Sequence, residues 1–414
     1  MAAPPPPPPS PSPLPVSLIR HLGPNWYAGV MGTAIVANAG VALPVRVPGL
    51  HTFSLVFWVL SAVMLAVLLT ARALHWARHP DQARDHLLDP AVAPFYGCLS
   101  MALLAVGGGT LLVGKDLIGL HAAVVTDAVL FVAGTAIGLL AAVGIPYLMV
   151  ESHRIRPGSA SPVWLLPVVA PMVSAALGPL LIPYLPPGQW QAALLLGCYT
   201  MFGLSMLATL VLLPIVFGRM VTGPRLPLVL TPTLFLVLGP LGQSVTAANK
   251  FADAAPGVVR SPYAEGFRML AVIYGVPVMG FALLWFVFAS AMLVRARRLG
   301  MRFSLTWWAL TFPVGTCVTG AEGLARHTGL DVYRWLAVFL YACLLAAWAA
   351  AASLTVRGLA TGAFVPAAVP AGTAGDAGAA GAGGAGGAAG ATEAAGAAGA
   401  AGAAGAAGAA AGRP

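Results

Sequence analysis

Residues 303–322 have the sequence FSLTWWALTFPVGTCVTGAE, which carries no charge before Glu322. An uncharged apolar run of this length predicts a helix that crosses a membrane. Pro313 lies at its middle and removes one backbone hydrogen bond, so the freed groups need partners in protein or in a water-filled cavity. We therefore expect this helix to face other helices. Phe312, directly before the break, is a candidate for the narrowest point of a path.

The composition places the whole chain in a lipid bilayer. Of its 414 residues, 59% are hydrophobic and only 8% are charged, whereas roughly a quarter of a soluble domain is charged. The net charge is +9, and the basic residues lie in short loops between apolar runs, where they set the orientation of a protein in the membrane. The positive charge therefore does not indicate a nucleic-acid partner. The four cysteines lie in apolar runs without CxxC spacing. We expect neither a disulfide framework nor a metal site, and no cofactor.

Ten apolar segments predict ten transmembrane helices, each long enough to cross a hydrocarbon core of ~30 Å. They cover approximately residues 26–43, 53–71, 92–113, 128–150, 162–183, 191–217, 228–248, 269–294, 303–321 and 335–356. With a cytoplasmic N-terminus, 13 Lys and Arg residues fall on the inside and 7 on the outside. This bias predicts that both termini are cytoplasmic, in a multi-pass protein of the plasma membrane.

The two ends of the chain differ from its middle. Residues 1–21 begin with a polyproline run, which has no core to bury, and residues 357–414 end in Gly/Ala repeats in which glycine opposes helix formation. We expect both ends to be disordered and residues 22–356 to form the transmembrane domain.

Helix-breaking residues concentrate in the odd-numbered segments. Examples are the Gly107–Gly109 run in the third segment and Gly239-Pro240 in the seventh. Kinked odd helices inside and straighter even helices outside would give five helical hairpins around a central pore. The alternative is that Gly and Pro are simply common in membrane helices. The pore-lining candidates are Gly32, Thr33, Gly108, Pro171, Gly239, Pro240, Gln243 and Pro313.

Charged side chains are missing from the centres of the predicted spans. Asp127 and Glu322 fall at predicted ends. Because proton-coupled carriers usually need a buried titratable group, this favours a passive path. Selectivity would then come from pore width and from the positive ends of broken helices, which suit anions.

Four stretches resemble the tellurite-resistance/dicarboxylate transporter family, in the right order along the chain. They are GPNWYAGVMG at 23–32, WLLPVVAPMVSAALGP at 164–179, GPLGQS at 239–244 and FSLTWWALTFP at 303–313. The resemblance implies an all-α membrane protein of ten helices, arranged as five hairpins in quasi-fivefold symmetry. It also implies a homotrimer with one pore per subunit, permeation of small anions such as C4-dicarboxylate, sulfite or tellurite, and a pore-occluding phenylalanine at Phe312.

Several functional classes stay open at this point. A passive anion channel competes with a proton-coupled organic-anion exporter, whose flux would depend on a pH gradient. A membrane-embedded enzyme would need convergent nucleophiles or metal ligands, and the sequence contains no GxSxG and no HExxH. A receptor or scaffold is a further alternative. The residues do not specify which anion is carried.

Overall fold

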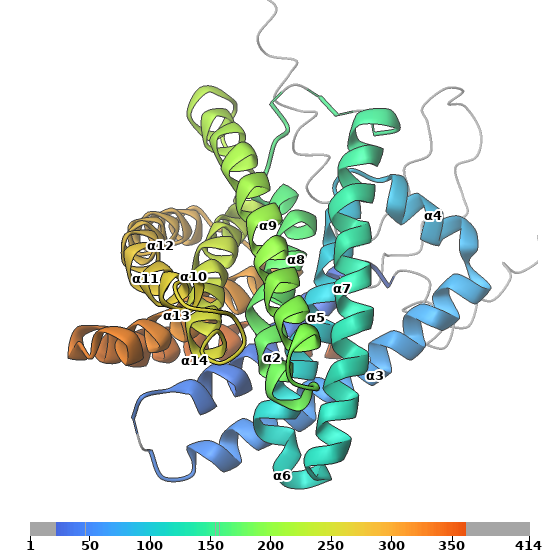
Figure 1. The fold of residues 1–414 in the computed structure, drawn as a ribbon. Coiled ribbons are helices and arrows are strands. Elements are labelled where there is room, and N and C mark those ends of the chain that lie inside the picture. The colour runs from blue at the N-terminus through green and yellow to red at the C-terminus, as the bar shows by residue number, and fades with distance from the viewer. Residues whose placement is uncertain (1–21, 46, 154, 157, 362–414) are drawn as a thin grey trace, which may run out of the picture.

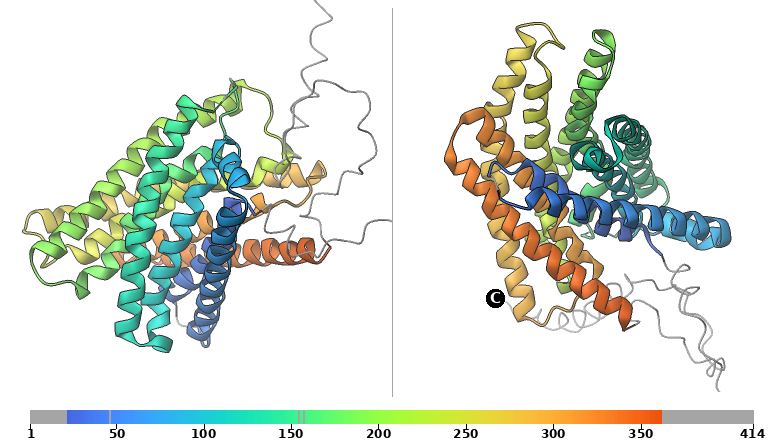
Figure 2. Two further views of the ribbon diagram at one scale, coloured as in Figure 1. Left: turned by 90° about the vertical axis from the view of Figure 1, so that its right-hand side faces the viewer. Right: turned by 90° about the horizontal axis from the view of Figure 1, so that it is seen from below.

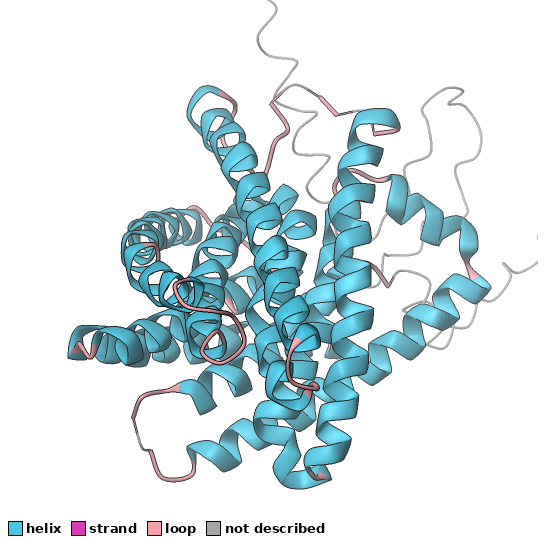
Figure 3. Cartoon of the chain, viewed as in Figure 1, coloured by secondary structure: helices cyan, strands magenta, loops and turns pink. Residues whose placement is uncertain are grey.

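A computed structural model describes residues 22–45, 47–153, 155–156 and 158–361 of the chain. Within these ranges the chain forms helices, turns and loops, with no strand (Figure 3). The predicted disordered N-terminus, residues 1–21, lies outside the described residues. So does the predicted tail from residue 362, whereas residues 357–360 continue the last helix.

Five helices are buried almost along their whole length. They are α2 (Tyr27–Ala42), α5 (Tyr96–Gly109), α8 (Leu165–Leu177), α10 (Leu238–Ala254) and α13 (Phe312–Thr328). A 3-10 segment leads into each one: η1 (Pro24–Trp26), η2 (Ala93–Phe95), η4 (Pro162–Trp164), η6 (Leu228–Val237) and η7 (Leu305–Leu310). Three of them, η1, η2 and η4, have a proline in their first turn, because its fixed φ suits a helix start, where its missing N–H is not needed.

The ninth segment differs from its predicted form in this respect. Pro313 lies in the first turn of α13, and a turn at Thr311 separates α13 from η7. Pro313 therefore begins a helix instead of kinking one. The helix also continues beyond the predicted end at residue 321, as far as Thr328.

Longer helices surround the buried five (Figure 1). They are α3 (Leu50–Arg78), α7 (Leu120–Glu151), α9 (Gln189–Thr222), α11 (Tyr263–Ile273) with α12 (Gly275–Arg298), and α14 (Asp331–Ala360). Shorter elements complete the described chain: α4 (Pro80–Leu88), the π-helical turn η3 (Thr110–Gly114), α6 (Lys115–Ile118) and η5 (Gly178–Tyr184).

Burial separates the two groups of helices. In the most apolar stretch of each outer helix only 22–28% of the residues are buried, against 83–89% for the spans containing α5, α8 and α10. The exposed side chains of the outer helices are largely apolar, such as Val132 and Leu284, so this surface suits lipid. The predicted contrast between buried odd segments and exposed even segments is therefore present among these helices.

The buried helices contact one another in a closed ring. α2 packs against α5, α5 against α8, α8 against α10, α10 against α13, and α13 returns to α2. The first helices of the chain, in blue, thus lie beside the last ones, in orange (Figure 2). The α10–α13 contact depends on Gly242, where a Cβ atom would lie 2.6 Å from the backbone nitrogen of Cys317. No larger residue fits at this crossing without moving the two backbones apart.

Eight of the described helical segments are long and apolar enough to cross a membrane. α2 and α13, with 16 and 17 residues, are shorter than the roughly 20 residues that a straight span needs. Two helices extend beyond the predicted spans. α7 begins at Leu120 and α13 runs to Thr328, so the buried side chains of Asp127 and Glu322 lie inside helices and not at their ends.

Candidate conduction pathway

The ring of five buried helices encloses two cavities that share one side chain. The larger, of about 130 Å³, and the smaller, of about 10 Å³, are both lined by Phe312. The smaller cavity has room for at most one water molecule. Phe312 is 3% exposed, and every other residue that lines the smaller cavity is apolar.

Phe312 is held by the break between η7 and α13. Thr311 precedes it and donates a hydrogen bond from Oγ1 to the carbonyl oxygen of Trp308, 2.7 Å away. Pro313 follows and lines the smaller cavity together with Gly239 of α10. The aromatic ring therefore projects from a helix start whose backbone is fixed on both sides.

The larger cavity has a polar wall near the middle of the helices. Asn38 donates from Nδ2 to the carbonyl oxygen of Ala105 at 2.9 Å, and the hydroxyls of Thr246 and Thr319 lie 2.7 Å apart. Gln243 is 2% exposed, and its amide oxygen has no hydrogen-bond partner among the described residues. A buried polar group without a partner is costly, so an unpaired amide at a cavity wall suits a polar occupant such as water or a solute.

Charged side chains complete the wall at one end of this cavity. Lys250 of α10 and Glu322 and Arg326 of α13 line it. Arg326 lies 2.6 Å from Glu322 and 3.0 Å from Asp253, which also lies 3.2 Å from His327. Within the described chain, Lys250 has no carboxylate within 4.0 Å. The wall therefore combines a neutralised arginine with a lysine that lacks a direct ion pair.

The structure brings together four of the predicted site residues. Phe312 lines both cavities, Pro313 and Gly239 line the smaller one, and Gln243 lines the larger. Gly108 faces Leu177, which itself lines the larger cavity.

The other four candidates have contacts elsewhere. A Cβ atom at Gly32 would meet Thr311 and Trp308, so this glycine marks the packing of α2 against η7. Thr33 accepts a hydrogen bond at 3.0 Å from Nε1 of Trp348 on α14. Pro171 and Pro240 are buried in α8 and α10 but line neither cavity.

The charged wall was not predicted from the sequence. Lys250 and Glu322 lie just beyond the predicted spans 228–248 and 303–321, because a predicted span is a run without charge. One local signal was present: Glu322 and Arg326 are four residues apart, a spacing at which opposite charges pair on a helix.

A closed ring of buried helices around cavities, inside a shell of exposed apolar helices, defines a polytopic membrane transport protein. The family model of SLAC1, a voltage-dependent anion channel, matches residues 21–356, and the chain belongs to this family. Proteins of the family are transporters or channels, not enzymes. The chain is thus a membrane protein of an anion transporter and channel family.

Curated relatives from fungi and archaea match most of the chain. A sulfite efflux pump, SSU1, of Arthroderma otae is 27% identical over 344 residues, which cover 82% of this chain and 91% of that protein. An uncharacterized transporter, MJ0762, of Methanocaldococcus jannaschii is 25% identical over 348 residues, or 84% and 97%. The sulfite efflux pump SSU1 of Candida albicans is 22% identical over 350 residues, or 79% and 72%.

Proposed function

We propose that the chain conducts small anions through the ring of buried helices and that Phe312 closes this path. The observation that carries the proposal is that Phe312 lines both cavities, of which the larger has polar and charged side chains in its wall and the smaller is apolar. Phe312 is 3% exposed and stands at the start of a helix. In this proposal the path opens when its side chain changes rotamer and joins the two spaces.

The proposed path requires ten membrane crossings, because α2 and α13 belong to the ring. With its 3-10 entry, the segment from η1 to the end of α2 reaches about 30 Å, and η7 with α13 reaches more than 35 Å. Both lengths suffice for a hydrocarbon core of ~30 Å. The proposed arrangement is five hairpins in quasi-fivefold order, with both termini cytoplasmic, in the plasma membrane.

Several features support an anion as the solute. Lys250 lines the larger cavity and has no direct ion pair within the part of the chain that the structure describes. The start of α13 also places a helix N-terminus beside Phe312. Two relatives named above are called sulfite efflux pumps, so sulfite is the first solute to test. C4-dicarboxylates, tellurite and inorganic anions follow in the same panel, and a homotrimer is the proposed assembly.

A second candidate function is proton-coupled export of organic anions. It is favoured by one observation: Glu322, a titratable group, lines the larger cavity. A pH gradient that drives anion uptake into liposomes without an anion gradient would support coupling. Flux that follows only the anion gradient would support the passive path.

The test of the proposed gate is the substitution Phe312→Ala in liposomes. We expect sulfite or chloride efflux to rise about tenfold or more, equivalent to removing about 1.4 kcal/mol or more of barrier. Phe235→Ala is the matched control, because Phe235 is equally buried at 3% but lines neither cavity. Unchanged flux through a folded Phe312→Ala protein would contradict the gate.

A further inference from the structure

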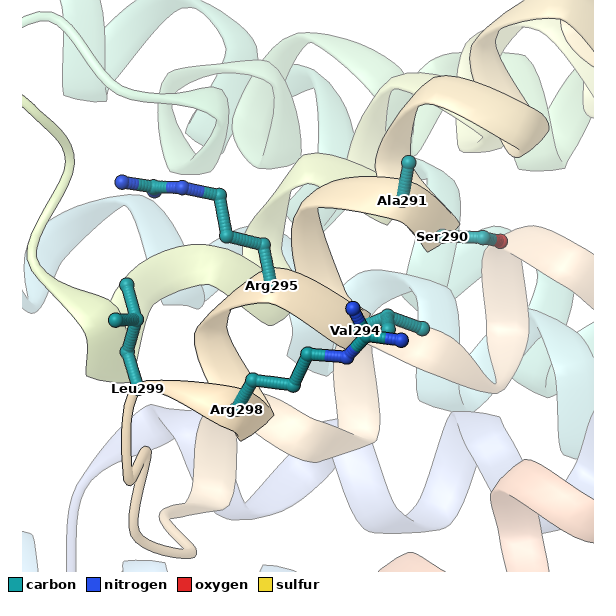
Figure 4. Close-up of a pocket in the computed structure, with 6 residues that line it drawn as sticks. All are labelled: Ser290, Ala291, Val294, Arg295, Arg298 and Leu299. Carbon is teal, nitrogen blue, oxygen red and sulfur yellow. The ribbon is translucent and has the colours of Figure 1, made fainter.

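A surface pocket at the end of α12 lies apart from the proposed path. It has a volume of about 560 Å³ and is lined by Ser290, Ala291, Val294, Arg295, Arg298 and Leu299 (Figure 4). None of these residues lines either cavity of the ring. The pocket combines two guanidinium groups with an apolar wall, an arrangement that a purely apolar lipid face does not need.

The two arginines of this pocket lack acidic partners. Within the part of the chain that the structure describes, no carboxylate lies within 4.0 Å of Arg295 or Arg298. Arg297, on the other side of the helix, is engaged instead: its guanidinium lies 5.3 Å from the centroid of the Trp307 ring. All three arginines are exposed, but within the described chain neither Arg295 nor Arg298 lies over an aromatic ring.

An apolar stripe leads along α12 to these arginines. Leu284, Val287 and Val294 are 62%, 68% and 50% exposed and lie on one face at spacings of three and seven residues. At 1.5 Å per residue, the stripe from Leu284 to Val294 is about 15 Å long, which matches one leaflet of a hydrocarbon core of ~30 Å. The arginines thus lie where a leaflet meets its headgroups.

We propose that this pocket binds an anionic phospholipid, with its phosphate on Arg295 and Arg298 and an acyl chain along the stripe. Figure 4 shows Arg298 folded back beside Val294, whereas Arg295 extends away from it. Both side chains are exposed, so they can turn toward one headgroup without disturbing the core. Guanidinium groups bind phosphate oxygens in pairs of parallel hydrogen bonds, which a lysine ammonium cannot reproduce.

Two simpler roles for these arginines make different predictions. Basic residues at a helix C-terminus interact favourably with the helix dipole, and arginine at a membrane edge extends toward water. Either role would stabilise the fold without preferring one phospholipid headgroup over another. The lipid site predicts a headgroup preference that depends on both arginines.

The experiment is native mass spectrometry of the full-length protein in detergent, with equal amounts of dioleoyl phosphatidylglycerol and dioleoyl phosphatidylcholine. We expect the wild type to retain phosphatidylglycerol preferentially and the R295A/R298A variant to lose that preference by about tenfold. R295K/R298K keeps the charge but loses the paired geometry, so its preference should be intermediate. The matched control is R78A/R84A, which removes two exposed arginines, one at the end of α3 and one in α4.

Three outcomes would overturn the site. They are a wild type without headgroup preference, an R295A/R298A variant that keeps the wild-type preference, and a control that loses as much. Displacement of the lipid by millimolar glycerol 3-phosphate alone would also overturn it, because the acyl stripe would then contribute nothing. The melting temperature of each variant shows whether it is folded, and the lysine variant keeps the test decisive if the alanine variant is unstable.

Discussion

Arg326 Nε lies 2.6 Å from Glu322 Oε1 in the wall of the larger cavity, four residues away on the same helix. The same guanidinium reaches Asp253 of α10 at 3.0 Å, so one arginine is held by two carboxylates from two helices of the ring. This arrangement neutralises Arg326, whereas Lys250, the other cation of the wall, has no direct ion pair among the described residues.

Replacing Glu322 with Gln should increase anion flux at low salt by roughly twofold to fivefold. The substitution makes the wall more positive by one charge, while Asp253 continues to hold Arg326. Because mobile ions screen such effects, the gain should shrink as ionic strength rises. Liposome efflux at two salt concentrations measures it. Asp331→Asn, which changes an acid at the exposed start of α14, should leave flux unchanged.

Replacing Lys250 with Met should lower anion flux by about fivefold and weaken selectivity for anions over cations. The apolar stem keeps much of the side-chain volume, so the change removes mainly the charge. Reversal potentials in a salt gradient report the selectivity. Lys115 is the other lysine of the chain and lies exposed at the start of α6, so Lys115→Met is the natural control. Equal effects of both variants would show that Lys250 has no special place in the path.

The sequence was sufficient to predict the class of the molecule and the contrast between its buried and exposed helices. Both follow from local composition: prolines favour helix starts, and a buried helix tolerates the small residues that let backbones approach. The place of Phe312 beside Pro313 makes it a candidate in the sequence, and in the structure it lines two cavities. These predictions depended on neighbours along the chain.

Features that depend on distant partners were not predictable in the same way. The ion pair between Asp253 and Arg326 joins residues from two helices, and no local pattern announces it. Gly32 and Thr33 contact η7 and α14 and not the cavities. A helix that is apolar on all sides does not show in its own sequence which face turns toward a cavity, so these contacts could not be predicted.

Gly242→Ala should destabilise the protein by about 1–3 kcal/mol through overpacking of α10 against α13. The added methyl group would meet Thr316 and the backbone of Cys317, which cannot move without shifting α13. Gly280→Ala on α12 is matched in chemistry but meets nothing within 4 Å, and alanine should be neutral or slightly stabilising there. Thermal unfolding in detergent compares the two. Equal melting temperatures would argue against a tight crossing at Gly242.

Acidification should loosen the short helix α4. Burial, followed by the nearby charges of Arg72 and His75, lowers the pKa of His86 from 6.5 to about 4, although Asp89 and Asp85 oppose the shift. The folded state therefore binds a proton less readily than the unfolded state. The docking of α4 through the neutral His86 side chain is therefore fully stable above about pH 7, and it loses stability as the pH drops from 6.5 toward 4.

The contacts of α4 make this loosening measurable. The His86 ring stacks on that of His75 with centroids 5.5 Å apart, and Ala83 of the same helix is fully buried. Hydrogen exchange of residues 80–88, corrected for intrinsic rates, should be faster at pH 4.5 than at pH 7. His86→Gln should remove most of that difference, whereas His51→Gln, at an exposed contact with Asp116, should preserve it. Protection of α4 that is independent of pH in the wild type would show that protonation of His86 does not control the docking of this helix.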